Sequence, residues 1–286
     1  MKTNIVAACP GQKVRLSEID ADETAGMSKQ EAIQQIGQLR EKVSELQQIL
    51  YAEHRQSLLI VFQAMDTGGT DGTIRKLLSG INPAGIRVTS FKVPWHQELD
   101  HDFLWRTHKA TPPKGLIGVW NRSHYEDVLV VRVHKLVERD IWKSRFDQIN
   151  SFERILTSNG TTIVKFMLHI SKDEQERRLQ ARLDNPEKWW KFSPSDLKER
   201  AFWDDYQEAY EETINRCSTD FAPWHVVPAN RKWARDLAVI ELLFRVLKRM
   251  DPRYPKLTFD PKAVTINPQQ PVGQKKLKET VEKATS

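Results

Sequence analysis

Cysteine and long apolar runs are nearly missing from this sequence, and each absence excludes classes of protein. Only Cys9 and Cys217 occur in 286 residues, far apart and without Cys-x-x-Cys spacing, which argues against a disulfide framework or a zinc site. No apolar stretch approaches transmembrane length, and the first residues lack the apolar core of a signal peptide. The sequence therefore predicts a cytoplasmic protein without a membrane partner.

Metal-ligand spacing and hydrolase motifs are absent too. Eight histidines are scattered along the chain, and neither a nucleophile elbow nor a His-Glu-x-x-His pattern occurs. The sequence does carry an excess of positive charge, with a formal net charge of +6 and a pI of about 9.2. This excess fits a polyanionic partner such as nucleic acid, an anionic membrane or a phosphorylated substrate. Lysines that merely solvate the surface would explain it as well.

Apolar runs of buried-strand type alternate with amphipathic helical stretches, which predicts an α/β fold with a parallel sheet and helices on both faces. The expected strands cover residues 58–62, 86–91, 116–120, 162–170 and 224–227. The expected helices cover residues 28–54, 98–108, 140–159, 200–217 and 233–250, and a further one begins at residue 171. Ser28 with Glu31, and Ser171 with Glu174, form capping boxes at two of these helix starts.

The chain divides into three parts by composition. Residues 1–56 form an arm, irregular up to residue 27, and an amphipathic helix; residues 57–255 form the core; and residues 256–286 form a weakly ordered tail rich in proline, glutamine and lysine. Residues 184–198 are rich in proline, tryptophan, lysine and serine, which suggests a mobile or ligand-covering segment.

A glycine-rich loop follows the first expected core strand and precedes a helix. Gly68, Gly69 and Gly72 would let backbone amides approach a phosphate at the helix N-terminus, although a glycine triplet alone is more often a simple turn. The general phosphate-loop pattern requires Gly, Lys and Ser or Thr where this chain has Ala64, Thr70 and Asp71. The context thus favours a phosphate site, whereas three residues depart from the pattern.

Carboxylates beside such a loop repel phosphate unless a cation lies between them. Asp66 and Asp71 are therefore candidates for a site that binds Mg²⁺ together with phosphate oxygens. A role in turn formation or helix capping explains each of them equally well.

Polar residues follow the strand expected at 116–120. Asn121 could place an oxygen on a metal-bound water and Arg122 a guanidinium on a phosphate, at the sheet edge that also carries the glycine loop. A structural salt bridge is the alternative for Arg122. Glu126 and Asp127 are candidates for a metal or nucleotide contact, and capping of a following helix is the alternative for both.

Cations and flat rings lie together in a later segment, where they could close over phosphates and stack on a base. The group comprises Arg177, Arg178, Arg182, Lys188, Trp189, Trp190, Lys191 and Phe192. Core packing of the two tryptophans is the more common outcome for such rings.

Several of these motifs occur in one order that resembles the polyphosphate kinase 2 family over nearly the whole chain. They are Gln63 to Thr73, Phe91 to Pro94, Asp100 to Arg106, Asn121 to Asp127, and Arg182 to Phe192. The form of the fourth motif most resembles the branch that phosphorylates both AMP and ADP with inorganic polyphosphate. The resemblance implies a phosphate-loop kinase fold, a helical lid near residues 171–200, Mg²⁺ as cofactor, and a homo-oligomer, either dimer or tetramer, that acts on AMP, ADP and ATP rather than nucleic acid.

The resemblance also assigns roles to individual residues. It makes Asp66, Arg122 and Arg178 catalytic, with Asp66 and Asn121 at the metal. Phosphate binding falls to Gly68, Gly69, Thr70, Asp71, Gly72, Thr73, Lys92 and Arg106, and nucleotide binding to Asn121, Glu126, Asp127 and Lys191.

Thr70 departs from the family pattern, which has a lysine at this position. A lysine there would neutralise bridging phosphates in a loose transition state, and loss of a comparable cation in phosphoryl transfer costs on the order of 10³-fold or more. Besides the polyphosphate-dependent transferase, two functions therefore stay open. One is an ATP-dependent nucleotide kinase, and the other is an inactive protein that binds polyphosphate or nucleotide.

Overall fold

A computed structural model describes residues 4–264, and the chain forms two compact units, Met1–Tyr254 and Pro255–Ser286. The description below concerns the first unit. Most of the predicted weakly ordered tail, residues 265–286, lies outside the described residues. None of the described helices is both long and apolar enough to span a membrane.

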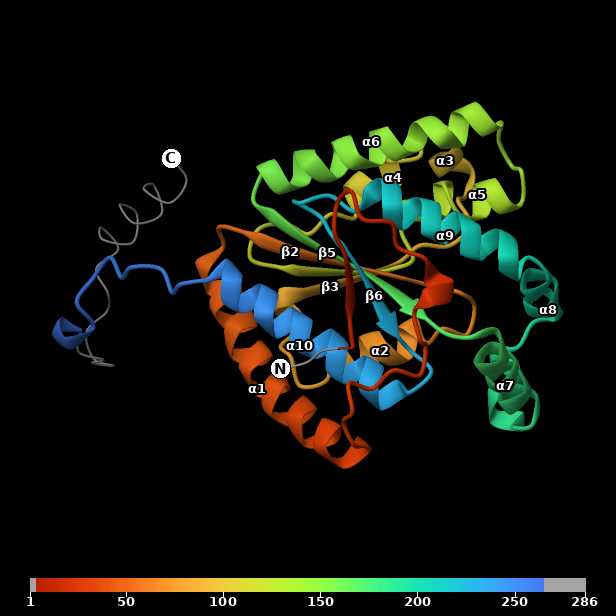
Figure 1. Ribbon diagram of the computed structural model, residues 1–286. Helices are drawn as coiled ribbons and strands as arrows, with labels where there is room; N and C mark the ends of the chain where they lie inside the picture. Colours follow the sequence, from red (N-terminus) through yellow and green to blue (C-terminus); the bar gives the residue numbers. More distant parts are fainter. Residues whose placement is uncertain (1–3, 265–286) are drawn as a thin grey trace. The chain divides into compact units, whose positions relative to one another are not determined.

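Six strands form one sheet in the order β1-β6-β5-β2-β4-β3 (Figure 1). The strands are β1 (Val6–Ala8), β2 (Ser57–Ala64), β3 (Ile86–Ser90), β4 (Ile117–Asn121), β5 (Thr161–His169) and β6 (Trp224–Pro228). Five of them run parallel, which confirms the predicted α/β class. β1 pairs antiparallel with β6, so the sheet is mixed and the prediction of a wholly irregular arm over residues 1–27 is wrong.

β2 lies between β4 and β5 and is buried at every position except Ala64. Burial on both faces explains the unbroken apolar run of its sequence. Lys165 interrupts the similar run of β5, and its buried ammonium group donates hydrogen bonds to the Glu153 carboxylate (2.6 Å), the Tyr125 hydroxyl (2.8 Å) and the Cys217 carbonyl (2.7 Å). Lys165 is thus a buried cation of the sheet whose three N–H groups are all paired.

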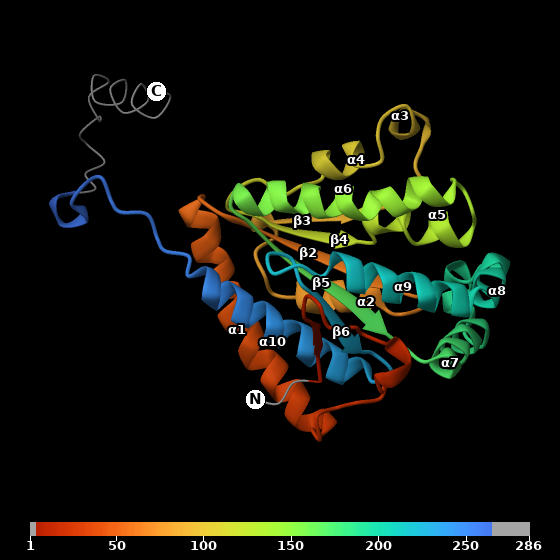
Figure 2. The ribbon, with the colours of Figure 1, turned by 45° about the horizontal axis from the view of Figure 1, so that its top comes forward.

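Helices cover both faces of the sheet (Figures 1 and 2). α1, α2 and α10 lie on one face, α6 and α9 lie on the other, and α7 and α8 lie at the end where the parallel strands finish. Their bounds are α1 (Lys29–Glu53), α2 (Thr70–Leu77), α3 (His96–Leu99), α4 (Trp105–Lys109), α5 (Val130–Val133), α6 (Arg139–Ser158), α7 (Lys172–Leu183), α8 (Pro194–Ala201), α9 (Trp203–Cys217) and α10 (Lys232–Met250). Short 3-10 turns of this unit are η1 (Leu16–Glu18), η2 (Pro83–Gly85), η3 (His124–Asp127) and η4 (Pro186–Lys191), and the second unit contains η5 (Pro261–Ala263).

Two local predictions about helices need correction. The single helix predicted over residues 98–108 is wrong, because the chain forms α3 and α4 with a break in which the Asp102 carboxylate accepts a hydrogen bond from the Leu104 amide (2.9 Å). The capping box of Ser28 and Glu31 is confirmed. At α7 only half of the predicted box forms: Ser171 accepts the Glu174 amide, but the Glu174 carboxylate pairs with arginines instead.

Candidate active site

The glycine loop connects β2 to α2 at the carboxyl end of the central strand. A Cβ on Gly68 would collide with the Ala64 side chain and lie 2.8 Å from the Met65 carbonyl, and Gly69 has φ +96°. Neither position tolerates a side chain without a shift of the backbone. Gly72 differs, because it lies inside α2 with open space around it. The tight turn therefore depends on Gly68 and Gly69.

Thr70 is the first residue of α2, and its hydroxyl makes no hydrogen bond within residues 4–264. Gly69 caps the helix without a side chain, so no side chain satisfies the first amides of α2. Thr73 donates its hydroxyl back to the Gly69 carbonyl (3.0 Å), which fixes the start of the helix. The loop thus presents helix-start amides and a hydroxyl, but no cation of its own.

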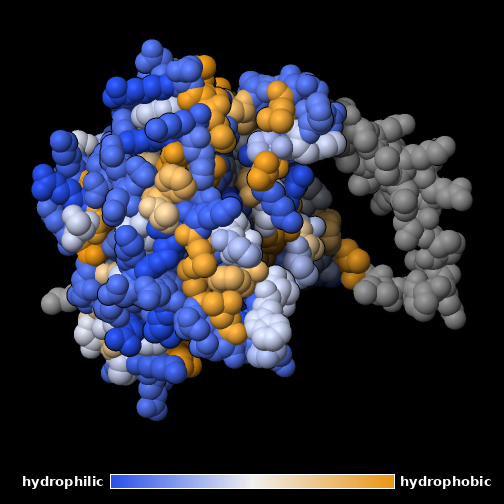
Figure 3. All heavy atoms as spheres, turned by 90° about the vertical axis from the view of Figure 1, so that its right-hand side faces the viewer, coloured by the Kyte–Doolittle hydropathy of each residue, from blue (hydrophilic) through white to orange (hydrophobic). Residues whose placement is uncertain are grey.

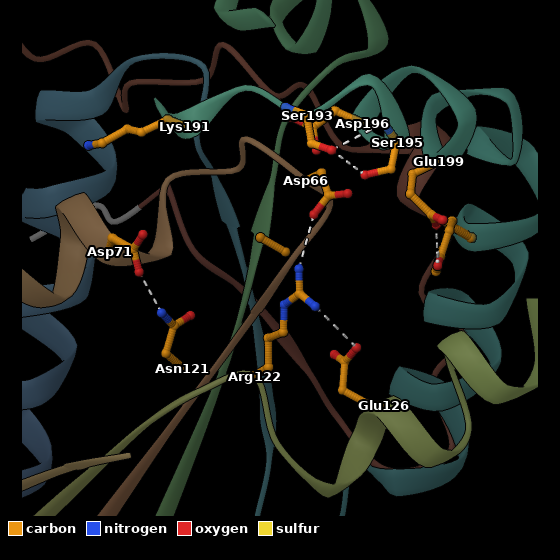
Figure 4. Close-up of polar contacts among 12 residues, drawn as sticks. Asp66, Asp71, Asn121, Arg122, Glu126, Lys191, Ser193, Ser195, Asp196 and Glu199 are labelled. Atoms are coloured by element: carbon orange, nitrogen blue, oxygen red, sulfur yellow. Dashed lines mark hydrogen bonds and ion pairs between the residues drawn. The ribbon is translucent and has the colours of Figure 1, made fainter. Parts of the chain in front are cut away.

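Arg122 follows β4 and reaches the loop from the neighbouring strand (Figure 4). Its amide donates to the Phe62 carbonyl (3.0 Å), and its guanidinium lies 3.1 Å from Asp66 Oδ1 and 4.0 Å from Glu126 Oε2. The backbone is left-handed (φ +61°), a strained conformation for arginine of the kind that occurs at functional sites. With 51% of its side chain exposed, Arg122 keeps N–H groups free for a ligand.

Burial raises the pKa of Asp66 above its ordinary value, and Arg122 opposes that shift. The pKa of Glu126 is raised for the same reason and is again opposed by Arg122. Burial alone would lower the pKa of Arg122, but Glu126 and Asp66 outweigh it and raise the pKa. The three groups therefore form one partly buried unit whose central cation is stabilised by two carboxylates.

Of the other site residues predicted after β4, Asn121 contacts the start of α2 and Asp127 pairs with a residue of α6. Asn121 donates its amide to Asp71 Oδ1 (2.5 Å), so it contacts the start of α2. Asp127 instead lies 3.2 Å from Arg145 of α6, and burial raises its pKa. The structure thus brings Asn121 and Arg122 to the loop, whereas Asp127 is paired on the far side of η3.

Arg178 of α7 reaches the loop from the β5 side. Its Nε donates to the Glu174 carboxylate (2.6 Å), and its two amino groups donate to four backbone carbonyls at 2.6 to 3.2 Å. These carbonyls belong to Thr67, Gly68, Ala229 and Asn230. All five N–H groups of the guanidinium are therefore used within the protein, and Arg178 supports the backbone of the loop in this structure.

The segment predicted as a lid contains α7, η4 and α8. Asp196 and Glu199 of α8 face Asp66 in Figure 4, whereas Lys191 extends away from it and lies 4.8 Å from the Trp190 ring centroid. Trp189 and Trp190 are exposed, so core packing of these rings is wrong. Figure 3 views the molecule from the side on which α7 and α8 lie, and hydrophilic side chains predominate there.

Lys92 and Arg106 lie beyond β3, the outer strand of the sheet. Arg106 donates to the Lys92 carbonyl (2.8 Å) and lies 3.4 Å from Glu98 Oε2, with little of its side chain exposed. The Lys92 side chain is exposed and makes no ion pair in the described part of the chain. Of these two predicted phosphate contacts, the structure leaves only Lys92 open to solvent.

Sequence reasoning missed two cations at the start of α10. Arg235 is buried, and a Cβ on Gly69 would collide with its Nη1. Lys232 lies one turn earlier, and its pKa is lowered by burial and by the neighbouring Arg178 and Arg235. The signal was available, because this helix follows a strand and opens with cations and no acidic residue.

The sequence profile of polyphosphate kinase 2 matches residues 26–255. An AMP/ADP-polyphosphate phosphotransferase of Meiothermus ruber is 51% identical over 249 residues, which cover 86% of this chain and 93% of the relative. An ADP-polyphosphate phosphotransferase of Rhodopseudomonas palustris is 48% identical over 230 residues, which cover 76% of this chain and 80% of the relative.

A solved structure shares the fold as well. The crystal structure of polyphosphate kinase 2 from Arthrobacter aurescens superposes with a TM-score of 0.86 at 42% identity, covering 92% of this chain and 97% of that one.

Proposed function

This chain belongs to the polyphosphate kinase 2 family, and on that premise we propose that it transfers a phosphoryl group reversibly between inorganic polyphosphate and AMP or ADP. The names of both relatives, from Meiothermus ruber and Rhodopseudomonas palustris, support these substrates. The observation that carries the proposal is the half-exposed Arg122, held by Asp66 and Glu126 beside the glycine loop. A fixed cation next to backbone amides is what a transferring phosphoryl group requires.

The reaction proceeds by in-line displacement without a covalent enzyme intermediate. A terminal phosphate oxygen of AMP or ADP attacks the end phosphorus of polyphosphate, and the bond between that phosphorus and the bridging oxygen breaks. The bridging oxygen keeps the electron pair and becomes the new end of the shortened chain. Arg122 and the first amides of α2 offset the charge on the transferring group, while Arg178 holds the loop in shape.

Asp66 and Asn121 fit a role as Mg²⁺ ligands. Asp66 Oδ1 pairs with Arg122 and Asn121 Nδ2 donates to Asp71, so each residue keeps one oxygen without a hydrogen bond within residues 4–264. No group of three His, Cys, Asp or Glu side chains in these residues could hold a metal by itself. Mg²⁺ commonly binds through one or two protein oxygens plus water and phosphate. When bound, it supplies positive charge to the phosphate oxygens.

Thr70 decides how fast this site works, and a paired assay tests it. The protein and its Thr70→Lys variant are incubated with polyphosphate, Mg²⁺ and AMP or ADP, and nucleotide products are separated by chromatography. We expect slow product formation by the natural sequence and a rise of about 10²-fold or more in the variant, because lysine adds a cation at the transferring phosphate. Failure of both proteins to form product would overturn the proposal.

An inactive polyphosphate-binding protein is the second candidate, and the lack of a cation at Thr70 favours it. It predicts salt-sensitive binding of polyphosphate without turnover by the natural sequence, followed by recovery of turnover in Thr70→Lys. An ATP-dependent kinase would instead phosphorylate AMP with ATP and be inhibited only weakly by polyphosphate. Assembly as a homo-oligomer stays a prediction, as does a cytoplasmic location, which the unpaired Cys9 and Cys217 support.

A further inference from the structure

The turn that carries Arg122 is held in a strained form. Arg122 has φ +61°, a left-handed conformation that a residue other than glycine keeps only where its surroundings enforce it. Its amide donates to the Phe62 carbonyl (3.0 Å), which fixes the turn at the end of β4. On its other side the turn continues directly into η3, so the contacts of η3 must fix it there.

Tyr125 lies in η3, three residues after Arg122, and its side chain is fully buried. Its hydroxyl donates to Glu153 Oε1 of α6 (2.7 Å) and accepts from Lys165 Nζ of β5 (2.8 Å). Its ring packs edge-on against Trp224 of β6, with the ring centroids 4.8 Å apart. Contacts with one helix and two strands thus set how deeply the Tyr125 side chain lies, and with it the position of η3.

Glu153 is the centre of these contacts. Its Oε2 accepts from Lys165 (2.6 Å), and its Oε1 lies 3.4 Å from His124 Nε2 as well as accepting from Tyr125. Burial alone would raise the pKa of Glu153, but Lys165 and His124 outweigh it and lower the pKa. Two consecutive residues of η3 therefore converge on one buried, charged carboxylate. We define the Glu153 anchor as Tyr125, Glu153 and Lys165.

Stability alone does not account for this anchor. Removal of two charges from water costs free energy that their attraction often fails to return, and apolar side chains of similar volume frequently stabilise a core as well or better. A buried network with its hydrogen bonds made instead fixes one arrangement of the groups that it joins. Lys165 uses all three N–H groups in this way, so the anchor favours a single placement of η3.

We propose that Tyr125 is a positioning residue for phosphoryl transfer: its contacts with Glu153 and Lys165 hold the strained turn and so keep the Arg122 guanidinium beside the glycine loop. The inference rests on the proposed function for the role of Arg122. Tyr125 is fully buried and does not touch substrate. Without its hydroxyl the turn relaxes towards an ordinary backbone conformation, and the guanidinium moves away from the transferring phosphoryl group.

Hydrogen exchange tests the anchor without reliance on turnover. Tyr125→Phe removes one hydroxyl, and Lys165 keeps its bonds to Glu153 and to the Cys217 carbonyl. We expect the Arg122 amide to exchange roughly tenfold faster in this variant, because the loss of one buried hydrogen bond favours local opening of the turn. The exchange rate of this amide is measured by NMR.

Ser57→Ala is the matched control. Ser57 is buried at the first position of β2, at the end of the strand opposite the glycine loop, and its hydroxyl bonds to the hydroxyl of Thr161 (3.0 Å). This change also removes one buried hydrogen bond, but it should leave exchange of the Arg122 amide unchanged. No acceleration in Tyr125→Phe, or equal acceleration in both variants, would overturn the proposal.

A double-mutant cycle in the Thr70→Lys background tests whether Tyr125 acts through Arg122. Tyr125→Phe should lower kcat about tenfold and change the KM for polyphosphate by less than about twofold, because a displaced guanidinium loses contact chiefly with the transition state. In Arg122→Gln the same change should lower kcat by less than about twofold, since no guanidinium remains to be positioned. Ser57→Ala should leave kcat unchanged.

The proposal is overturned if Tyr125→Phe lowers kcat by the same factor with and without Arg122, or if it leaves kcat unchanged. Circular dichroism and thermal unfolding check that Tyr125→Phe is folded. If it is not, Glu153→Asp decides in its place, because it keeps the charge that Lys165 requires and withdraws the acceptor of the Tyr125 hydroxyl by one methylene group.

The two proposals fail in different ways. Absence of turnover in both the natural sequence and Thr70→Lys overturns the proposed function, and hydrogen exchange still decides whether Tyr125 holds the turn of Arg122. Turnover that is insensitive to Tyr125→Phe overturns the positioning role alone.

Discussion

Arg122 and Arg178 approach the same glycine loop from opposite sides and are used in opposite ways. Arg122, on the β4 side, is 51% exposed and pairs only with carboxylates. Arg178, on the β5 side, is 7% exposed and donates to four backbone carbonyls as well as to Glu174. A guanidinium with all its hydrogen bonds made thus supports the shape of the loop, whereas one with free N–H groups stays open to solvent and available to a ligand.

Removal of Arg178 is the most severe test of this contrast. Arg178→Ala leaves four backbone carbonyls without their donor and removes one of the two arginines that pair with Glu174, so we expect the free energy of unfolding to fall by about 4 kcal/mol in urea titrations. Arg182→Ala on the same helix is the control, and its partly exposed ion pair with Asp196 should cost about 1 kcal/mol or less. A stable Arg178→Ala variant that loses only polyphosphate binding would reverse the assignment of the two arginines.

Acid should destabilise the folded protein through His225, which lies in β6. Burial lowers the pKa of His225 to about 4, below its unfolded value of about 6.5. Between these two pKa values the unfolded chain binds a proton at His225 and the folded protein does not. The free energy of unfolding therefore falls by about 3 kcal/mol as the pH falls from about 6.5 to about 4. Urea titrations across this range should show a flatter pH dependence for His225→Gln.

The carboxyl groups on the Arg122 side respond to acid in the opposite direction. Burial raises the pKa values of Asp66 and Glu126 in the folded state, so their protonation makes folding more favourable as the pH falls. If His225→Gln kept the full acid sensitivity of the natural sequence, the buried histidine would not be its source.

Arg122→Gln should affect the reaction rather than the fold. In the Thr70→Lys background we expect kcat to drop by about 10²-fold, because the charge on the transferring group loses its guanidinium. The free energy of unfolding should change by about 1 kcal/mol or less, since the ion pairs of Arg122 are half-exposed. Steady-state kinetics and urea titrations measure the two quantities. A large stability loss with unchanged kcat would make Arg122 a structural residue.

The smallest expected effect concerns the end of β2. Tyr210 of α9 donates its hydroxyl to the Ala64 carbonyl (3.0 Å) just before the loop. Tyr210→Phe should reduce the free energy of unfolding by about 1 kcal/mol. Tyr51→Phe serves as the control, since Tyr51 is exposed and its hydroxyl makes no hydrogen bond in the described residues. Equal effects of the two changes would show that the bond to Ala64 adds nothing.

The meeting of the glycine loop with Arg122 was predictable, because parallel strands end at one edge of a sheet whatever their separation in sequence. The differences among Arg177, Arg178 and Arg182 were not. The three arginines occupy one helix, yet their side chains are 66%, 7% and 26% exposed. Burial of Arg178 depends on carbonyls of Thr67 and Gly68, more than a hundred residues away, and no local pattern encodes that contact.

β1 was missed for a similar reason. Its three residues carry too little periodicity to indicate a strand, and the partner that makes them one is Trp224–Pro228. Arg235 was missed because α10 is an amphipathic helix with several charged residues, and sequence reasoning assigns such residues to the solvent face. Only the packing of α10 against α2 brings it to Gly69.

The pairing of β1 with β6 has a consequence for synthesis on the ribosome. Val6 pairs with Val226, and Asp22 contacts Asn230 and Arg231 (2.8 Å each) at the start of α10. Residues 6–8 therefore wait until residues 224–226 have been synthesised before this side of the sheet can form, a contact of high sequence separation that slows folding. Until then β1 has no partner strand, and a nascent chain stalled before residue 224 leaves one edge of β5 unpaired.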